Sequence, residues 1–245
     1  MFVLALDSDV ARLTLDRAEA RNAIPAAAWP VLAGKAEESV AAGARLLLIA
    51  GAGSAFCAGA DLSEFEAMSR DAAAVAAFRD AMRDSLARLA ALKIPTLAII
   101  EGACFGAGVA LAMACDIRVA APAAGFAITP AKLGISYPQE DVHRLVSLVG
   151  RGQAARLLLG AVIIGGEEAA AIGLVEICSE APEEAAASLA QAMLANSPAS
   201  LETLKRAIAL AAAGTGSDAA QDRRFDELLL SDDLRARLLA RRNGR

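Results

Sequence analysis

Histidine, tryptophan and tyrosine each occur once in this 245-residue sequence, and aromatic residues make up only 4% of it. With a single histidine, a structural zinc site would have too few ligands, so we expect no metal centre. The four cysteines also lack the paired spacing of a disulfide framework; they are Cys57, Cys104, Cys115 and Cys178. We therefore predict buried free thiols in a protein of the reducing cytoplasm.

Excess positive charge and long apolar runs are likewise missing. The 24 basic and 29 acidic residues give a net charge of −5, which argues against nucleic acid as a partner. No apolar run approaches the roughly 20 residues of a membrane-spanning helix. The start of the chain lacks the basic region of a signal peptide, and we expect no membrane partner. The length of the chain is enough to bury one sizeable core.

Two glycine-rich segments, residues 51–62 and 102–110, carry the most informative pattern in the sequence. Each follows a short apolar run typical of a buried strand, at residues 46–50 and 96–100, and each leads into a helical pattern. A helix that starts after a tight turn leaves backbone N–H groups unpaired, and small residues let a ligand approach them. If the turns converge, two N–H groups can hold one oxygen as an oxyanion hole. The alternative is that glycine serves only the steric demands of a strand–helix connection.

The order of the predicted elements indicates an α/β domain followed by helices. Strands are expected at residues 1–6, 11–15, 46–50, 96–100, 116–120 and 125–128. Helices are expected at residues 26–42 and 72–92, from the second turn to residue 114, and at residues 138–149, 152–159, 167–172, 182–195, 199–213, 217–230 and 232–242. Ser63 and Asp71 are the expected N-caps of the helices that follow them.

Several segments, in the same order, resemble the crotonase (enoyl-CoA hydratase/isomerase) superfamily. Residues 56–62 resemble its first signature and residues 102–117 its second. Residues 16–24 are similar to the loop that holds the adenine end of coenzyme A. The resemblance implies a spiral of ββα units over residues 1–195 and a helical C-terminal trimerisation region over residues 196–245. It also implies a homotrimer or a dimer of trimers.

The resemblance further implies an acyl-CoA thioester as substrate, with coenzyme A as part of the substrate and no separate cofactor. The thioester carbonyl would accept hydrogen bonds from the backbone N–H groups of Ala60 and Ala107. Alanine stands at the second position where the family usually has glycine, and it preserves the donor if its φ is negative. The other expected substrate contacts are Ala23, Ala58, Asp61, Leu62 and Gly106.

Both glutamates that a hydratase of this family uses are missing. A hydratase needs two carboxylates, one to activate water and one to handle the proton at the α-carbon. The corresponding positions are Ala110 and Pro130, and Pro138 occupies the position of a later acid that isomerase-like members use. The chain is therefore expected to be an isomerase or to catalyse other non-hydratase chemistry.

Glu140 and Asp141 are the candidate replacements for proton transfer, because they align with residues that line the family's pocket. The alternative is that they complement the dipole at a helix N-terminus, with Glu140 paired to Arg144. Tyr137 is a candidate donor to the substrate, or an ordinary half-buried tyrosine. His143 is chemically suited to proton transfer, but its position beside the apolar stripe favours a surface or packed side chain.

A few further side chains near these motifs have competing interpretations. Cys57 and Cys104 lie in the two signatures, but no histidine accompanies them, which favours packing over nucleophilic catalysis. Glu64 is interpreted as an acid at a helix N-terminus. Arg241 and Arg242 either meet coenzyme A phosphates or complete the last helix.

The favoured hypothesis is an enzyme that acts on an acyl-CoA through an enolate held by Ala60 and Ala107. A second hypothesis is a catalytically inactive acyl-CoA-binding or scaffold homologue, which the missing glutamates favour. A third is a small-molecule enzyme that does not use coenzyme A.

Overall fold

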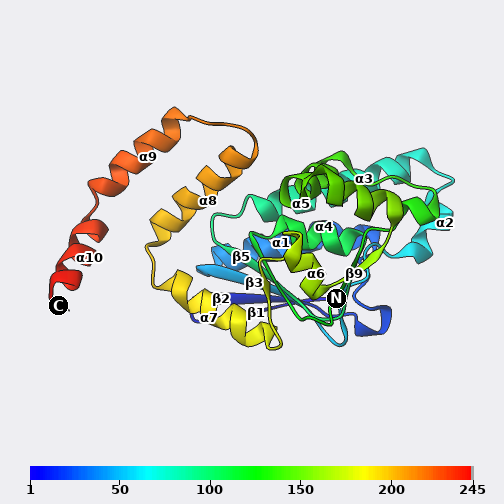
Figure 1. Ribbon diagram of the computed structural model, residues 1–245, viewed down its shortest axis with the longest axis horizontal. Coiled ribbons are helices and arrows are strands. Elements are labelled where there is room, and N and C mark those ends of the chain that lie inside the picture. The colour runs from blue at the N-terminus through cyan, green and yellow to red at the C-terminus, as the bar shows by residue number, and fades with distance from the viewer. Residues whose placement is uncertain (244–245) are drawn as a thin grey trace.

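Two β-sheets organise the first part of the chain in the computed structural model, which describes residues 1–243 (Figure 1). Within these residues, one sheet has the strand order β1-β2-β3-β5-β7-β10 and the other has the order β4-β6-β8-β9. All neighbours run parallel except β1–β2 and β8–β9. The strands are β1 (Phe2–Asp7), β2 (Val10–Leu15), β3 (Leu46–Gly51), β4 (Ala55–Cys57), β5 (Thr96–Ile100), β6 (Ala103–Phe105), β7 (Ile117–Ala120), β8 (Gly125–Ala127), β9 (Ile163–Gly165) and β10 (Ile177–Cys178).

Strand β3 illustrates why the central strands are apolar along their whole length. Side chains alternate between the two faces of a strand, and both faces of this sheet are covered. Leu47 and Ile49 belong to the main core, which they share with α1, α3 and α4, while Leu46 and Leu48 pack with α7 on the opposite face. A parallel sheet covered on both sides needs such continuous apolar runs.

The helices follow the strands as the repeating pattern predicts. The α-helices are α1 (Trp29–Ala41), α2 (Phe65–Met68), α3 (Ala72–Ala90), α4 (Ala107–Ala114), α5 (Gln139–Gly160), α6 (Gly166–Ala171), α7 (Pro182–Leu194), α8 (Pro198–Ala212), α9 (Ala219–Leu229) and α10 (Asp232–Asn243). Short 3-10 turns are η1 (Ala18–Ala20), η2 (Ala26–Ala28), η3 (Leu62–Glu64) and η4 (Pro130–Leu133). The carboxylate of Asp71 accepts hydrogen bonds from the N–H groups of Ala73 and Ala74, which confirms its role as the N-cap of α3.

The two helices expected at 138–149 and 152–159 are confirmed as the two parts of α5, which meet at Gly150, where the backbone is non-helical (φ 73°). Two local expectations need correction. Asp61, not Ser63, caps the turn after the first glycine-rich segment, because its carboxylate accepts the Ser63 N–H. The glycine-rich segments also contain the short strands β4 and β6, which were not predicted. Each has only three residues, too few for a periodic pattern to show in the sequence.

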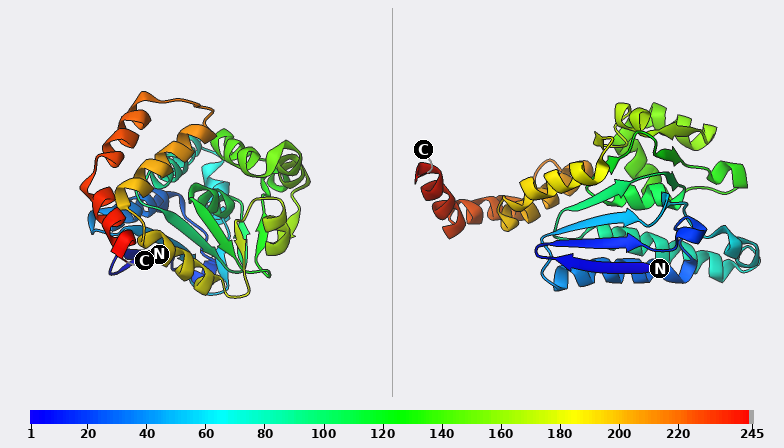
Figure 2. Two further views of the ribbon diagram at one scale, coloured as in Figure 1. Left: turned by 60° about the vertical axis from the view of Figure 1, so that its left-hand side comes forward. Right: turned by 90° about the horizontal axis from the view of Figure 1, so that it is seen from below.

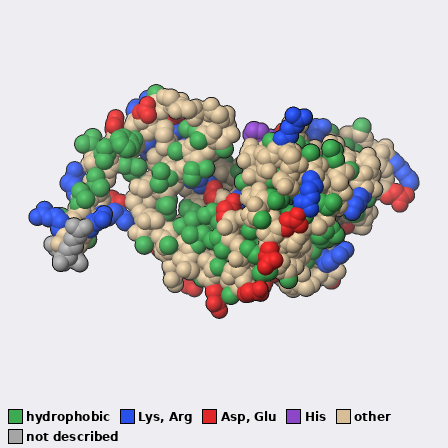
Figure 3. All heavy atoms as spheres, in the orientation of Figure 1, with side chains coloured by type: hydrophobic (Ala, Val, Ile, Leu, Met, Phe, Trp, Pro, Cys, Tyr) green, Lys and Arg blue, Asp and Glu red, His purple; other side chains and the backbone are tan. Residues whose placement is uncertain are grey.

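Helices α8, α9 and α10 form an arm that leads away from the sheets (Figure 2). Apolar side chains gather on this arm (Figure 3); its exposed residues include Leu204, Ile208, Phe225, Leu229, Leu230, Leu238 and Leu239. The arm corresponds to the predicted C-terminal region 196–245, of which residues 244 and 245 lie outside the described part. No helix in residues 1–243 combines the length and the apolar character that a membrane span requires.

Candidate active site

The two glycine-rich segments meet where β4 and β6 lie side by side. Their strands pair in parallel, with Cys57 opposite Cys104. Gly59 (φ 105°) makes the close approach possible, since a Cβ at this position would lie 2.8 Å from the Phe105 carbonyl oxygen and 3.2 Å from the Ala107 nitrogen. Glycine at residue 59 is therefore needed both for its backbone conformation and for the contact between the segments.

A cavity of about 520 Å³ opens beside this junction. Ala60 and Ala107 both line it, together with Ala58, Leu62 and Gly106 from the same two segments. Its remaining walls come from helices α2 and α3 and from the stretch between β8 and α5. Among the described residues that line it, Arg79 alone has a side chain that is charged at neutral pH, and none has a carboxylate. The cavity thus suits an apolar group.

The backbone amides of Ala60 and Ala107 are left out of the hydrogen bonding of the described chain. Around Ala60, the Ile24 N–H donates to the Gly59 carbonyl at 2.8 Å and the Asp61 N–H donates to the Ile24 carbonyl at 3.0 Å. Ala107 opens α4, where an N–H has no acceptor within the helix. Its φ is not positive, so alanine satisfies the condition for a backbone donor at this position. Two residues whose N–H groups have no acceptor in the described chain therefore line one cavity.

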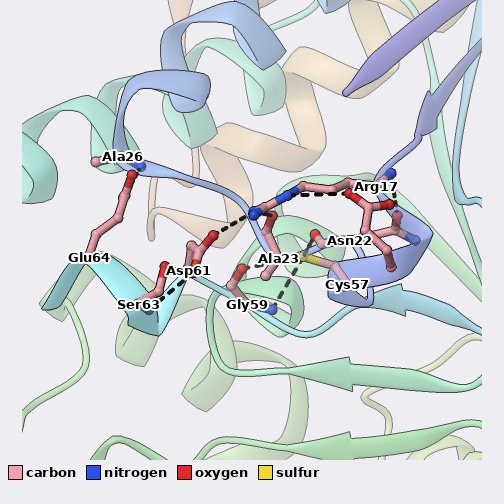
Figure 4. A network of polar contacts seen from close by, with 10 residues as sticks. Arg17, Asn22, Ala23, Ala26, Cys57, Gly59, Asp61, Ser63 and Glu64 are labelled. Carbon is pink, nitrogen blue, oxygen red and sulfur yellow. Dashed lines mark hydrogen bonds and ion pairs between the residues drawn. The ribbon is translucent and has the colours of Figure 1, made fainter.

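Asp61 holds the first segment against the loop that precedes α1 (Figure 4). Its carboxylate accepts hydrogen bonds from the Ser63 hydroxyl at 2.6 Å and from the Arg17 guanidinium at 2.5 Å. These hydrogen bonds, from Ser63 and then Arg17, lower the pKa of Asp61 to about 2. The carboxylate expected to contact coenzyme A is thus engaged within the protein.

Asn22 is a structural residue of the site that sequence reasoning missed. Its side chain is fully buried and donates to the carbonyls of Ala52 at 2.9 Å and Ala55 at 2.7 Å, while its oxygen accepts the Arg17 N–H at 2.9 Å. Its φ of 58° is left-handed, a conformation in which asparagine is enriched. An asparagine in a short loop, with its preference for left-handed backbone conformations, was the signal in the sequence that could have identified this residue.

Two neighbours complete the contact between the loop and the first segment. The Ala23 carbonyl accepts a hydrogen bond from Arg17 at 3.1 Å, and Ala23 is not among the cavity-lining residues. The Glu64 carboxylate accepts the Ala26 N–H at 2.7 Å (Figure 4). Glu64 therefore ties the loop to the segment, consistent with a structural interpretation of this acid.

Glu140 and Asp141 occupy different environments at the start of α5. The Glu140 side chain is 52% exposed, and its carboxylate lies 4.0 Å from Arg83. Asp141 is buried, and its carboxylate accepts a hydrogen bond from Arg144 at 2.9 Å. Burial raises the pKa of Asp141, although Arg144 opposes the shift. Neither acid is among the residues that line the cavity.

Tyr137 lines the cavity, and its hydroxyl is directed to the protein backbone. The hydroxyl donates to the Gly106 carbonyl at 2.9 Å. Burial raises the pKa of Tyr137 well above its usual value, and the charge of Asp141 raises it further. The phenol is therefore protonated at neutral pH.

The remaining candidates, Cys57, Cys104 and His143, are not among the residues that line the cavity. Burial raises the pKa of the Cys57 thiol to about 12 and that of Cys104 well above its usual value. His143 is exposed on α5. All four cysteines are free in the structure, as predicted, although Cys178 is only partly buried.

Comparison with known proteins assigns the family. Residues 6–235 match the family model of enoyl-CoA hydratase/isomerase. The enoyl-CoA isomerase/hydratase fer4 of Mycosarcoma maydis is 32% identical over 222 residues, which cover 83% of this chain and 78% of that protein. The mitochondrial methylglutaconyl-CoA hydratase of Homo sapiens is 36% identical over 159 residues, which cover 62% of this chain and 46% of the human protein.

A solved structure agrees with these matches over the whole chain. An enoyl-CoA hydratase/isomerase family protein from Hyphomonas neptunium superposes with a TM-score of 0.95 and 34% identity, covering 100% of this chain and 95% of that chain. The protein described here therefore belongs to the enoyl-CoA hydratase/isomerase family. The crotonase fold expected from the two signatures is confirmed.

Proposed function

We propose that the protein converts an acyl-CoA thioester through an enolate whose oxygen is held by the amides of Ala60 and Ala107. The observation that carries this proposal is that both alanines line one cavity while their N–H groups lack acceptors in the described chain. Preorganised donors of this kind stabilise charge that develops in the transition state, and each contributes about 10²–10³ in rate.

The described residues that line the cavity include no carboxylate, which disfavours hydration by two carboxylates, and we propose isomerisation or other non-hydratase chemistry. Hydration needs groups that activate water and move protons. Ala110 is buried in α4 and Pro130 lines the cavity, and neither side chain can transfer a proton. Of the two candidate acids, Asp141 is better suited than Glu140, because it is buried and its pKa is raised, whereas the Glu140 side chain is 52% exposed.

The same absence supports a second candidate function, a catalytically inactive protein that binds acyl-CoA. Such a protein would keep the cavity and its two amides while lacking a group for proton transfer. The two functions differ in whether bound substrate exchanges its α-proton with solvent.

The cavity and the arm support a substrate class and an assembly. The wall is apolar apart from a few polar side chains, which fits an uncharged acyl chain. The exposed apolar side chains on α8, α9 and α10 fit a surface covered by another copy of the chain, and we propose a homotrimer or a dimer of trimers. The free thiols fit a reducing compartment such as the cytoplasm.

Turnover and α-proton exchange distinguish the candidates. A panel of enoyl-CoA and 3-oxoacyl-CoA thioesters is offered to the wild type and to Glu140→Gln, Asp141→Asn and the double variant, with exchange followed in deuterated water. Turnover or exchange in the wild type supports the enzyme. Tight binding without exchange supports the inactive homologue. Full activity in all three variants would show that neither acid transfers the proton.

Ser147→Ala is the matched control for these variants. Ser147 lies on the same helix α5, is exposed, and donates only to the His143 carbonyl at 2.9 Å. Its loss removes a side-chain hydrogen bond from α5 without altering the cavity, so turnover at the wild-type rate is expected.

A further inference from the structure

We propose that Tyr137 is a positioning residue that orients and strengthens the Ala107 oxyanion donor. The proposal rests on the proposed function. Tyr137 donates its hydroxyl hydrogen to the Gly106 carbonyl at 2.9 Å. That carbonyl and the Ala107 N–H belong to one and the same peptide group. A side chain from the stretch between β8 and α5 therefore holds one end of the peptide whose other end would meet the substrate.

A hydrogen bond to a peptide oxygen makes the N–H of the same peptide a stronger hydrogen-bond donor. The donor draws electron density toward the oxygen, so the nitrogen becomes more positive and its hydrogen a better donor, as in any cooperative hydrogen-bond chain. The Gly106 oxygen also accepts the N–H groups of Val109 at 3.0 Å and Ala110 at 3.3 Å. The hydroxyl of Tyr137 is the shortest of these three contacts.

The hydroxyl also opposes rotation of this peptide. Gly106 has φ 51° and ψ −118°, and turning the following peptide by half a turn would bring ψ to 62° (−118 + 180 = 62). With its positive φ, that conformation lies near the left-handed helical region, which glycine occupies readily. Such a rotation would turn the Ala107 N–H out of the cavity. Alanine at residue 107 resists the matching change in its own φ, and Tyr137 adds a second restraint.

The following proline and the hydrophobic core hold Tyr137 in place. Pro138 follows it directly and precedes α5, and a residue before proline is confined to extended conformations. The ring packs against the main hydrophobic core. Ala110, the position of the missing first glutamate, donates its N–H to the same Gly106 carbonyl at 3.3 Å. The single tyrosine of the sequence is thus fixed against the first turn of α4.

The test compares Tyr137→Phe with the wild type and with Ser147→Ala. Phenylalanine keeps the ring and removes only the hydroxyl. We expect kcat to fall roughly 3–10-fold with KM nearly unchanged, because the variant loses the one neutral hydrogen bond from Tyr137 to the peptide that carries the Ala107 N–H. A conjugated dienoyl-CoA reports on the carbonyl directly, since its absorption moves to longer wavelength when the thioester oxygen accepts stronger hydrogen bonds. We expect a smaller red shift in the variant.

Fluorinated tyrosine provides a second test that does not depend on how well the variant folds. Because Tyr137 is the only tyrosine in the sequence, growth on 3-fluorotyrosine labels this position alone. The fluorinated phenol is more acidic and donates a stronger hydrogen bond, so the red shift should increase beyond that of the unlabelled protein.

The outcomes separate this inference from the proposed function. A red shift in the wild type that is unchanged by Tyr137→Phe and by fluorination overturns the role of Tyr137 and leaves the oxyanion hole standing. Bound dienoyl-CoA with no red shift in the wild type overturns both. A red shift that falls in Tyr137→Phe, rises with fluorotyrosine and stays constant in Ser147→Ala supports the inference.

Discussion

Single side chains tie the loop before α1 to the first glycine-rich segment. Asn22 donates to two carbonyls of that segment, and the Arg17–Asp61 pair strengthens the same contact (Figure 4). None of these three residues lines the cavity. Their contribution is therefore expected mainly in stability and in the geometry of Ala60.

Asn22→Ala is expected to lower the free energy of unfolding by about 2–4 kcal/mol. The substitution leaves one buried carbonyl, one partly buried carbonyl and one N–H without their partner, and each such loss costs about 1–3 kcal/mol before relaxation. Urea denaturation measures the change. Asn196→Ala is the control, because Asn196 is exposed and its side chain donates only to the Ala192 carbonyl; its effect should stay below about 0.5 kcal/mol. Equal effects would contradict the structural role of Asn22.

Asp141→Asn should gain stability relative to the wild type as pH rises. Burial raises the pKa of Asp141 in the folded state, so this carboxyl contributes stability below its unfolded pKa and loses it as pH rises through the folded pKa. Asparagine does not titrate. Urea denaturation of both proteins between about pH 3 and 7 gives the difference in their free energies of unfolding. Asp61 titrates in both proteins, so its contribution cancels from this difference. A relative loss for the variant on raising the pH would mean that the Arg144 pair outweighs burial.

At the scale of elements, helices α2 and α3 form one wall of the cavity. Phe65 of α2 and Phe78 of α3 meet edge to face, with ring centroids 5.6 Å apart. Met68 and Phe78 line the cavity and also a second, more open groove of about 550 Å³. These two side chains therefore form a partition between the cavity and the groove.

Phe78→Ala is expected to shift the preference of the protein toward longer acyl chains. Removing the ring joins the cavity to the groove, so the methylenes of a long chain bury more surface, each worth about 0.8 kcal/mol when fully buried. The ratio of kcat/KM for long and short acyl-CoA thioesters measures the shift. For an inactive homologue, the ratio of dissociation constants replaces it.

Val75→Ala is the matched comparison for this experiment. Val75 lines the cavity but not the groove, so its truncation widens the cavity without opening the partition. A shift in preference of the same size in both variants would contradict the idea that Phe78 limits chain length.

At the scale of the whole molecule, the arm formed by α8, α9 and α10 is attached to the rest of the protein through contacts of α8. Lys205 of α8 donates to the Ile94 carbonyl at 2.8 Å and lies 2.8 Å from the Asp116 carboxylate. Beyond this anchor the arm presents apolar side chains to solvent, including Ile208, which is 70% exposed, and Phe225, which is 62% exposed. A fixed arm with an apolar surface is suited to reach a neighbouring copy.

Ile208→Glu combined with Phe225→Glu is expected to dissociate the proposed homotrimer or dimer of trimers. Two charges at an apolar interface carry a desolvation cost that exceeds the burial they replace. Sedimentation equilibrium of the purified protein measures the mass. Leu159→Glu is the control, because Leu159 is 81% exposed on α5, outside the arm. A monomeric wild type, or a variant that keeps the wild-type mass, would contradict the proposed assembly.

The sequence by itself determined the family, the order of elements and the two segments that form the site. The signals were local: the placement of glycines, the apolar runs at residues 46–50 and 96–100, and the Asp71 cap. Each could therefore be recognised in the sequence without knowledge of tertiary contacts. The missing glutamates at Ala110 and Pro130 were visible in the same way.

Only the tertiary structure decided which groups face the cavity. Glu140 and Asp141 are adjacent in the chain, yet one is exposed and the other buried, because successive helical residues lie about 100° apart around the axis. The bond from Tyr137 to Gly106 joins residues that are 31 positions apart. Contacts between residues so far apart in the chain depend on how strands and helices pack, which local periodicity in the sequence does not reveal.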